Sequence, residues 1–272
     1  MKRLALVLVA LLAWGQTVAS QSERLPDGVV STGTNDIAQT WLTRPTTRYG
    51  HGILGDGIEA GGLMVKTAGG QLYEHILPDG FVFEDRSARL IDLDGDGRDE
   101  IVVVLTSVSE GAALAVYGIV DGSIQLRAKT PHIGRPHRWL NPAEFADLDG
   151  DGNMEITAVW TPHLGRVLQA WRLVGGRLQQ VAAIQGYSNH AAGSPVQDLT
   201  EIVTLSDGRL ALAIPTPQHD EIAFIVLKHG KFTEVARKSA QGGITSPVRP
   251  GENGRQLEFA TGLKPLVKID IP

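Results

Sequence analysis

The chain has 272 residues, including 32 glycines and 14 prolines, and 42% of its residues are hydrophobic. Glycine and proline spread along the chain argue against helical bundles, coiled coils and helical solenoids, and the hydrophobic content excludes wholesale disorder. The formal net charge of −5 argues against nucleic-acid binding, and the absence of cysteine excludes disulfides, thiol catalysis and zinc sites built on cysteine.

The first residues carry the pattern of a targeting segment. Lys2 and Arg3 precede the uninterrupted apolar stretch 4–14, and small residues follow at 17–20. This order predicts a secretory signal peptide over residues 1–20, since the apolar stretch is shorter than the roughly 18 to 20 residues that span a bilayer. We therefore expect an exported protein, periplasmic or secreted, with no stable membrane insertion after cleavage. Residues 21–35 are expected to form a flexible mature N-terminus.

A glycine-rich stretch opens the body of the chain. Residues 50–55 match the dinucleotide-binding pattern GxGxxG, but the glycines that follow are incompatible with the helix that this motif requires. The adjoining residues 55–59 instead resemble a degenerate acidic loop. Its two carboxylates, Asp56 and Glu59, would hold a cation poorly by themselves.

Two segments, 91–101 and 146–156, repeat one acidic pattern 55 residues apart. Counting from Asp92 or Asp147, Asp occupies loop positions 1, 3 and 5, Gly positions 4 and 6, and Glu position 9. Short runs rich in Val, Ile, Leu and Trp follow each loop and are separated by turn residues, which predicts about four strands per period. A period near 50 residues is typical of a propeller or another array.

Weaker copies of the same order extend the pattern in both directions. They predict one all-β domain over residues 36–272, a β-propeller of five blades with four antiparallel strands each. The blades are expected at about 46–85, 86–135, 141–190, 196–240 and 244–272. The last unit lacks a strand, which residues 36–45 would supply, so that the N- and C-terminal segments pair and close the ring. Four or six blades and a β-sandwich are the structural alternatives.

The acidic loops are the candidate metal sites. Glycine lets each loop curl so that alternate carboxylates converge, and hard oxygen donors of this kind favour Ca²⁺. Position 12 falls inside a strand, which argues against an EF-hand, and a solvated turn without metal is the alternative. We expect two Ca²⁺ sites, in which the residues at position 7 contribute their carbonyls. The ligands would be Asp92, Asp94, Asp96, Arg98 and Glu100 in the first loop and Asp147, Asp149, Asp151, Asn153 and Glu155 in the second.

These loops, each followed by a strand and repeated at propeller spacing, resemble the FG-GAP/VCBS repeats of the integrin α-subunit head and of many secreted bacterial proteins. The resemblance covers residues 86–185 well and the remainder only through weak copies. It implies a β-propeller with Ca²⁺ between the first two strands of a blade. The literal Phe-Gly and Gly-Ala-Pro signatures are missing, and the other units lack the full acidic loop.

Histidines recur at the junctions between the predicted units. They could line a central face and bind a polar ligand, or they could serve packing by bonding neighbouring backbone. A zinc site lacks a third ligand at a recognisable spacing. Ser194, near His190 and Asp198, lacks the GxSxG context of a catalytic serine. The candidate ligand-binding residues are His51, His132, His137, Arg138 and His190.

Taken together, these features favour a monomeric ligand-binding or scaffold module whose partner is a protein or a glycan. The alternative is a glycan hydrolase or lyase with its site on the central face. That alternative needs a carboxylate pair or a His/Arg group without a metal role, for which Glu59, Asp198 and the cluster at 132–138 are the candidates. A passive envelope component without a ligand is the third hypothesis.

Overall fold

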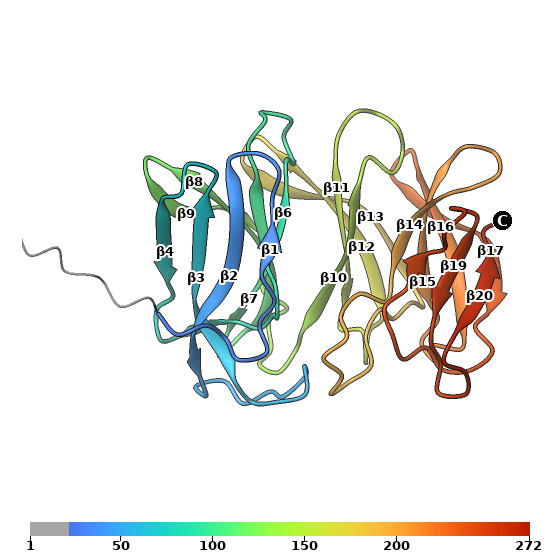
Figure 1. The fold of residues 1–272 in the computed structure, drawn as a ribbon, viewed down its shortest axis with the longest axis horizontal. Coiled ribbons are helices and arrows are strands. Elements are labelled where there is room, and N and C mark those ends of the chain that lie inside the picture. The colour runs from blue at the N-terminus through green and yellow to red at the C-terminus, as the bar shows by residue number, and fades with distance from the viewer. Residues whose placement is uncertain (1–21) are drawn as a thin grey trace, which may run out of the picture.

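The computed structural model describes residues 22–272, so the predicted signal peptide lies outside the described residues. This part of the chain forms twenty strands and no helix, which confirms the prediction of an all-β protein. It accordingly contains no helix that could cross a membrane. All strand pairs are antiparallel and join neighbours in a series of sheets (Figure 1).

The first sheet has nine strands and folds over into two halves. The halves are joined through β5, which meets β3 at the Ala60–Phe83 pair and runs along β7. The first half contains β1 (Ser31–Thr32), β2 (Ile37–Thr46), β3 (Glu59–Thr67) and β4 (Leu72–Ile76). The second contains β5 (Phe81–Phe83), β6 (Arg89–Ile91), β7 (Glu100–Ser107), β8 (Gly111–Val120) and β9 (Ser123–Lys129).

Three further sheets follow, each built from consecutive strands. The next sheet consists of β10 (Leu140–Ala146), β11 (Glu155–Trp160), β12 (Val167–Val174) and β13 (Arg177–Gln185). The one after it consists of β14 (Glu201–Thr204), β15 (Leu210–Pro215), β16 (Glu221–Lys228) and β17 (Lys231–Ser239). The last has only β18 (Arg249–Pro250), β19 (Gln256–Phe259) and β20 (Val267–Asp270).

One hydrophobic core lies between the two halves of the first sheet, and others lie between successive sheets. In β7, Ile101 and Val103 face the core shared with the first half of the sheet, whereas Val102 and Val104 face the core shared with β10 and β11. The strand is apolar at every position because both of its faces are covered. Further cores lie between the β10–β13 and β14–β17 sheets and between the β14–β17 and β18–β20 sheets. The β-sandwich alternative, with one core between two sheets, is therefore wrong.

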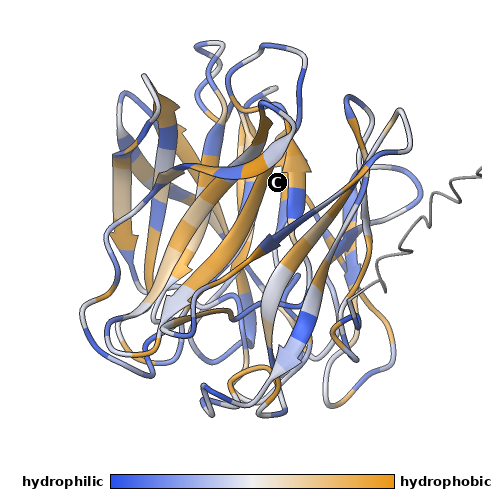
Figure 2. Ribbon diagram, turned by 90° about the vertical axis from the view of Figure 1, so that its left-hand side faces the viewer, coloured by the Kyte–Doolittle hydropathy of each residue, from blue (hydrophilic) through white to orange (hydrophobic). Residues whose placement is uncertain are grey.

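The predicted ring closure is also wrong. Residues 36–45 fall largely in β2, which pairs with β1 and β3 and not with the last sheet. The free face of the last sheet is polar, because Lys268 and Asp270 alternate with the buried Val267 and Ile269. Figure 1 shows the first sheet at one end of the series and β20 at the other. Figure 2 shows hydrophobic residues gathered on the strands and hydrophilic residues on the loops at both edges.

Part of the segment 21–35, for which the sequence predicts a flexible N-terminus, packs against the first sheet. Leu25 is buried, and its N–H donates to the carbonyl of Leu42 at 3.0 Å. Arg24 bridges to Thr43 on the same strand. The segment thus bonds the edge of β2 and buries Leu25 in the core of the first sheet.

Candidate functional site

The first acidic loop, which connects β6 to β7, is curled by its own backbone. The carboxylate of Asp92 accepts hydrogen bonds from the N–H groups of Gly95 at 2.8 Å and of Gly97 at 2.9 Å. Both glycines have positive φ, 74° and 81°, which residues with a Cβ rarely adopt. As a result, one carboxylate oxygen from each of Asp92, Asp94 and Asp96 lies within 4.8 Å of the others.

The second acidic loop connects β10 to β11 and repeats this design. Asp147 accepts hydrogen bonds from the N–H groups of Gly150 and Gly152, each at 2.8 Å. The oxygens that lie within 4.8 Å of one another belong here to Asp147, Asp149 and Glu155. Each loop therefore gathers three of its four predicted side-chain ligands. Figure 1 shows both loops at the same edge of the molecule.

The glutamate at position 9 accepts a hydrogen bond from the backbone of each loop. Glu100 accepts the N–H of Leu93, and Glu155 accepts the N–H of Leu148, both at 2.8 Å. Both glutamates are buried. Burial raises the pKa of Glu100 to about 7 and also raises the pKa of Glu155, against the opposing effect of these hydrogen bonds. Each loop thus holds a buried carboxylate whose charged form a nearby positive charge would stabilise.

An arginine enters each loop from another strand. Arg127 of β9 contacts Asp94 at 3.0 Å and also Glu100. Arg172 of β12 contacts Asp149 at 2.9 Å and Asp151 at 2.7 Å, and it also contacts Glu155. Arg127 lies on the last strand of its sheet, β9, whereas Arg172 lies on the third strand of its sheet, β12, so the two arginines do not occupy equivalent positions in the repeat. Sequence analysis missed both.

The two residues at position 7 differ in what their side chains do. Asn153 donates to Asp151 from its side chain at 2.9 Å and from its backbone at 3.0 Å, which lowers the pKa of the Asp151 carboxyl. Arg98 reaches out to Asp36 and to the carbonyl of Ile119. The donors gathered in both loops are carboxylate oxygens, which fit a hard cation such as Ca²⁺.

The degenerate loop at 55–59 is built differently. Asp56 accepts the N–H of Ile58, whereas Glu59 is buried. Burial, followed by the nearby charge of Glu84, raises the pKa of Glu59 to about 9. Among residues 22–272, neither carboxylate belongs to a group that could share an ion. Glu59 is therefore a buried carboxylic acid that is neutral at pH 7.

We call β1, β6, β10, β14 and β18 the inner strands. The predicted histidines meet at the end of β10 that is opposite to the second acidic loop. Trp139 comes just before β10 and Asp147 just after it, so the histidine end and the acidic end lie at opposite ends of this strand. A cavity of about 220 Å³ there is lined by His51, His137 and Arg138. The rings of His51 and His137 are 5.3 Å apart, and His51 Nδ1 bonds the buried carboxylate of Glu84. The structure thus brings together three of the five predicted ligand-binding residues.

His190 lies buried beside this cavity. Its Nε2 contacts the carbonyl of Ser194 at 2.8 Å, and its Nδ1 contacts Nε2 of His163 at 3.1 Å. Because a carbonyl only accepts, His190 donates from Nε2 and accepts from His163. Burial lowers the pKa of His190 to about 4. Sequence analysis missed His163, which lines the cavity and stacks on Trp139.

His132 is separate from this group. Its Nδ1 lies 2.8 Å from the carbonyl of Gly111, and it does not line the cavity. The Ser194 triad is also excluded, because His190 contacts the carbonyl of Ser194 and Asp198 pairs with Arg249.

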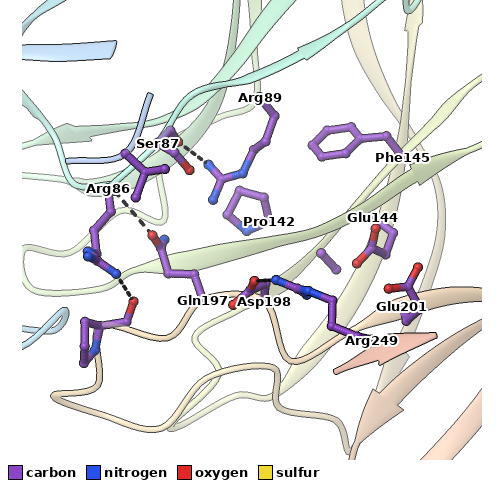
Figure 3. Close-up of a pocket in the computed structure, with 13 residues that line it drawn as sticks. Arg86, Ser87, Arg89, Pro142, Glu144, Phe145, Gln197, Asp198, Glu201 and Arg249 are labelled. Atoms are coloured by element: carbon purple, nitrogen blue, oxygen red, sulfur yellow. Dashed lines mark hydrogen bonds and ion pairs between the residues drawn. The ribbon is translucent and has the colours of Figure 1, made fainter. Parts of the chain in front are cut away.

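A larger cavity of about 480 Å³ runs along the inner strands (Figure 3). We call it the inner cavity. Every unit contributes to its wall, and only Asp198 among its members was singled out from the sequence. It is lined by Val29, Arg86, Ser87, Arg89, Pro142, Ala143, Glu144, Phe145, Pro195, Gln197, Asp198, Glu201 and Arg249.

Comparison with known proteins supports the resemblance drawn from the acidic loops. A family model for the FG-GAP-like repeat matches residues 92–158, which include both acidic loops and the strands between them. No curated protein sequence matches the chain. The chain therefore carries an FG-GAP-like repeat, which confirms the predicted resemblance.

Proposed function

We propose that the protein is an exported, calcium-binding β-propeller of five blades, open between the first and last blade, that acts as a binding or scaffold module. The observation that carries this proposal is the pair of acidic loops with the same internal hydrogen bonds inside an FG-GAP-like repeat. Export is supported by the signal-peptide pattern of residues 1–20.

Calcium would hold the ends of the inner strands in place. Bound in a loop, the ion supplies a positive charge among carboxylates that otherwise repel one another. β6 ends directly before Asp92 and β10 ends directly before Asp147, so the loops anchor two strands that border the inner cavity. At about ten times its Kd, each ion would contribute roughly 1.4 kcal/mol to the free energy of unfolding. The ligands would be the ten residues predicted from the sequence.

The inner cavity is the binding site that this proposal favours. Its volume lies within the range of about 300–1,000 Å³ that is typical of ligand sites, and its wall mixes charged, polar and apolar side chains. The smaller histidine cavity is a second candidate surface at the far end of the inner strands. The partner would be a protein or a glycan, bound by a monomeric module.

Screening the purified protein against glycan and envelope-protein arrays tests the module directly. We expect saturable binding of a partner that weakens when EDTA removes Ca²⁺, because the loops then no longer fix the inner strands. Partner binding that is the same with and without EDTA would contradict the structural role of the metal. A complete lack of partners across both arrays would contradict the binding function.

A glycan hydrolase or lyase is the second candidate function. It is favoured by Glu144 and Glu201, which supply in the inner cavity the metal-free carboxylate pair that this chemistry needs. Burial raises the pKa of Glu144 to about 7, which suits a general acid. Release of reducing ends from glycans, abolished in a Glu144→Gln variant, would establish this function. Intact glycans after prolonged incubation would exclude it for the substrates tested.

A further inference from the structure

Segments from every sheet form the wall of the inner cavity. Pro142 to Phe145 of β10 run along its side, so the cavity lies between the acidic loops and the histidine end. The remaining lining residues come from the segments around β1, β6, β14 and β18. The inner strands of all the sheets therefore border the same cavity.

A bulge in β10 displaces Glu144 from the regular strand. The pairing of β10 with β11 shifts between Pro142 and Phe145. The side chain of Thr157 holds the bulge, because it accepts the N–H of Glu144 at 2.9 Å and donates to its carbonyl at 2.7 Å. Bulges redirect side chains at functional sites. Here the Glu144 side chain lines the cavity, where Thr200 donates to it at 2.9 Å.

The three arginines in the wall are already neutralised. Arg86 pairs with Asp27 at 2.9 Å and donates to the carbonyl of Pro195 at 2.6 Å. Arg89 pairs with the buried Asp85. Their positive charges are therefore engaged by carboxylates behind the wall and are not free to bind an anionic ligand.

Arg249 is neutralised within the wall itself. Its guanidinium pairs with Asp198 and donates to the carbonyl of Val248. Figure 3 shows this pair between Gln197 and the two glutamates.

Two carboxylates in the wall, Glu144 and Glu201, have no direct ion-pair partner in the described part of the chain, although the nearby charge of Arg249 favours the charged form of both. Among residues 22–272, Glu144 and Glu201 form no ion pair with any lysine, arginine or histidine, in contrast to Asp198. Burial raises the pKa of both, and the charge of Glu201 adds to the effect on Glu144. A positively charged ligand would stabilise the charged form of these partly buried carboxylates.

We propose that the inner cavity binds an organic cation, an ammonium or guanidinium group on an aliphatic stem, with Glu144 and Glu201 as its acceptors. Val29, Pro142 and Phe145 supply an apolar wall for the stem. A lysine or arginine side chain of a partner and a free diamine share this chemistry. The inference rests on the proposed binding function and names its ligand class.

A metal ion fits this cavity less well. In residues 22–272, groups of three or more acidic or histidine side chains close enough to share one ion occur only in the two acidic loops. Hydrogen-bond donors on an organic cation can reach two separated carboxylates, and the stem can contact the apolar wall.

Isothermal titration with three probes tests the proposal. The probes are the peptide acetyl-Gly-Lys-Gly-amide, the same peptide with norleucine in place of lysine, and 1,5-diaminopentane. We expect the lysine peptide or the diamine to bind at least tenfold more tightly than the norleucine peptide. Tighter binding of the peptide would identify a protein side chain as the source, and tighter binding of the diamine a free amine.

Charge variants locate the site. Glu144→Gln and Glu201→Gln should each weaken cation binding about tenfold, whereas Arg249→Gln should tighten it because Asp198 is then released. Glu252→Gln, at an exposed position in the 251–254 turn, removes the same charge away from the cavity and should leave binding unchanged. A circular dichroism spectrum and a thermal midpoint for each variant show that it is folded.

Two results would overturn the inference. One is the lack of binding by either cation, and the other is equal affinity in the wild type and in a folded Glu144→Gln/Glu201→Gln variant. Measuring the Ca²⁺-dependent thermal midpoint on the same samples separates the two proposals. A protein that Ca²⁺ stabilises but that binds no organic cation would refute this inference and leave the calcium-dependent module standing.

Discussion

Arg172 places its guanidinium 2.9 Å from the carboxylate of Asp149, inside the second acidic loop. It also contacts Asp151 and Glu155, so it neutralises carboxylates that a bound cation would need. Arg127 has a similar relationship with Asp94 and Glu100 in the first loop. Each loop therefore carries an internal positive charge that competes with a metal ion for the same oxygens.

Replacing Arg172 with glutamine should strengthen calcium binding. The variant leaves three carboxylates without their guanidinium partner, so Ca²⁺ no longer competes with it. We expect Ca²⁺ affinity at the second loop to rise about five- to tenfold, equivalent to about 1–1.4 kcal/mol, measured by titration calorimetry. In EDTA the same variant should be less stable than the wild type, because the carboxylates then repel one another.

Arg177→Gln is the matched control for this change. Arg177 is exposed at the start of β13 and forms no ion pair among the described residues. Its replacement should leave Ca²⁺ affinity unchanged. Weaker Ca²⁺ binding in Arg172→Gln would instead mean that Arg172 positions the ligands and does not compete with the ion.

His190 should make the fold sensitive to acid. Its folded-state pKa of about 4 lies below the ordinary value of 6.5, so between these pH values the unfolded chain binds more protons. Stability therefore falls as the pH drops from about 6.5 to 4, and this residue accounts for up to about 3 kcal/mol of the loss. Urea titrations at several pH values measure the free energy of unfolding.

A His190→Gln variant isolates this contribution from that of other groups. Glutamine can still donate to the carbonyl of Ser194, but it does not titrate. The difference in stability between the wild type and the variant should shrink on acidification. His229→Gln, on an exposed turn, should leave the pH dependence as it is. An unchanged pH dependence in His190→Gln would show that the buried imidazole does not resist protonation.

Gly111 should tolerate no side chain. Its φ is +77°, and a Cβ there would lie 2.3 Å from the carbonyl oxygen of Arg135. The clash would displace the segment that carries His137 and Arg138. We expect Gly111→Ala to lower the thermal midpoint, with a cost of about 1–3 kcal/mol beyond that of Gly134→Ala.

Gly134 is a suitable comparison because it also has positive φ, 91°, but open space around its Cβ position. Both substitutions strain the backbone, and only Gly111→Ala adds a clash. Equal losses of stability in the two variants would contradict the close packing under the 132–138 segment.

The sequence predicted local features better than contacts between distant segments. Asp92 and its glycines lie within six consecutive positions, so their spacing alone specifies the curled loop. Arg172 follows Asp149 by 23 positions and lies on another strand, and Arg127 reaches its loop from a different strand of its unit. No repeat in the sequence pairs these arginines with the loops, so only the fold reveals them.

The inner cavity was unpredictable for a related reason. Glu144, Glu201 and Arg249 come from three sheets, and the bulge that displaces Glu144 depends on the side chain of Thr157 in the neighbouring strand. The predicted ring closure failed because strand patterns do not specify a partner. Residues 37–46 could pair with any free edge, and they pair with the strands next to them in the chain.

Equilibrium dialysis with ⁴⁵Ca²⁺ tests the central claim, calcium binding by the two acidic loops, most directly. We predict two bound ions per chain in the wild type, one in Asp94→Asn and one in Asp149→Asn, and none in the double variant. Millimolar Ca²⁺ is required to fill sites whose Kd is on the order of 10⁻⁴ to 10⁻³ M. No saturable binding to the wild type, or two ions still bound to the double variant, would contradict the account.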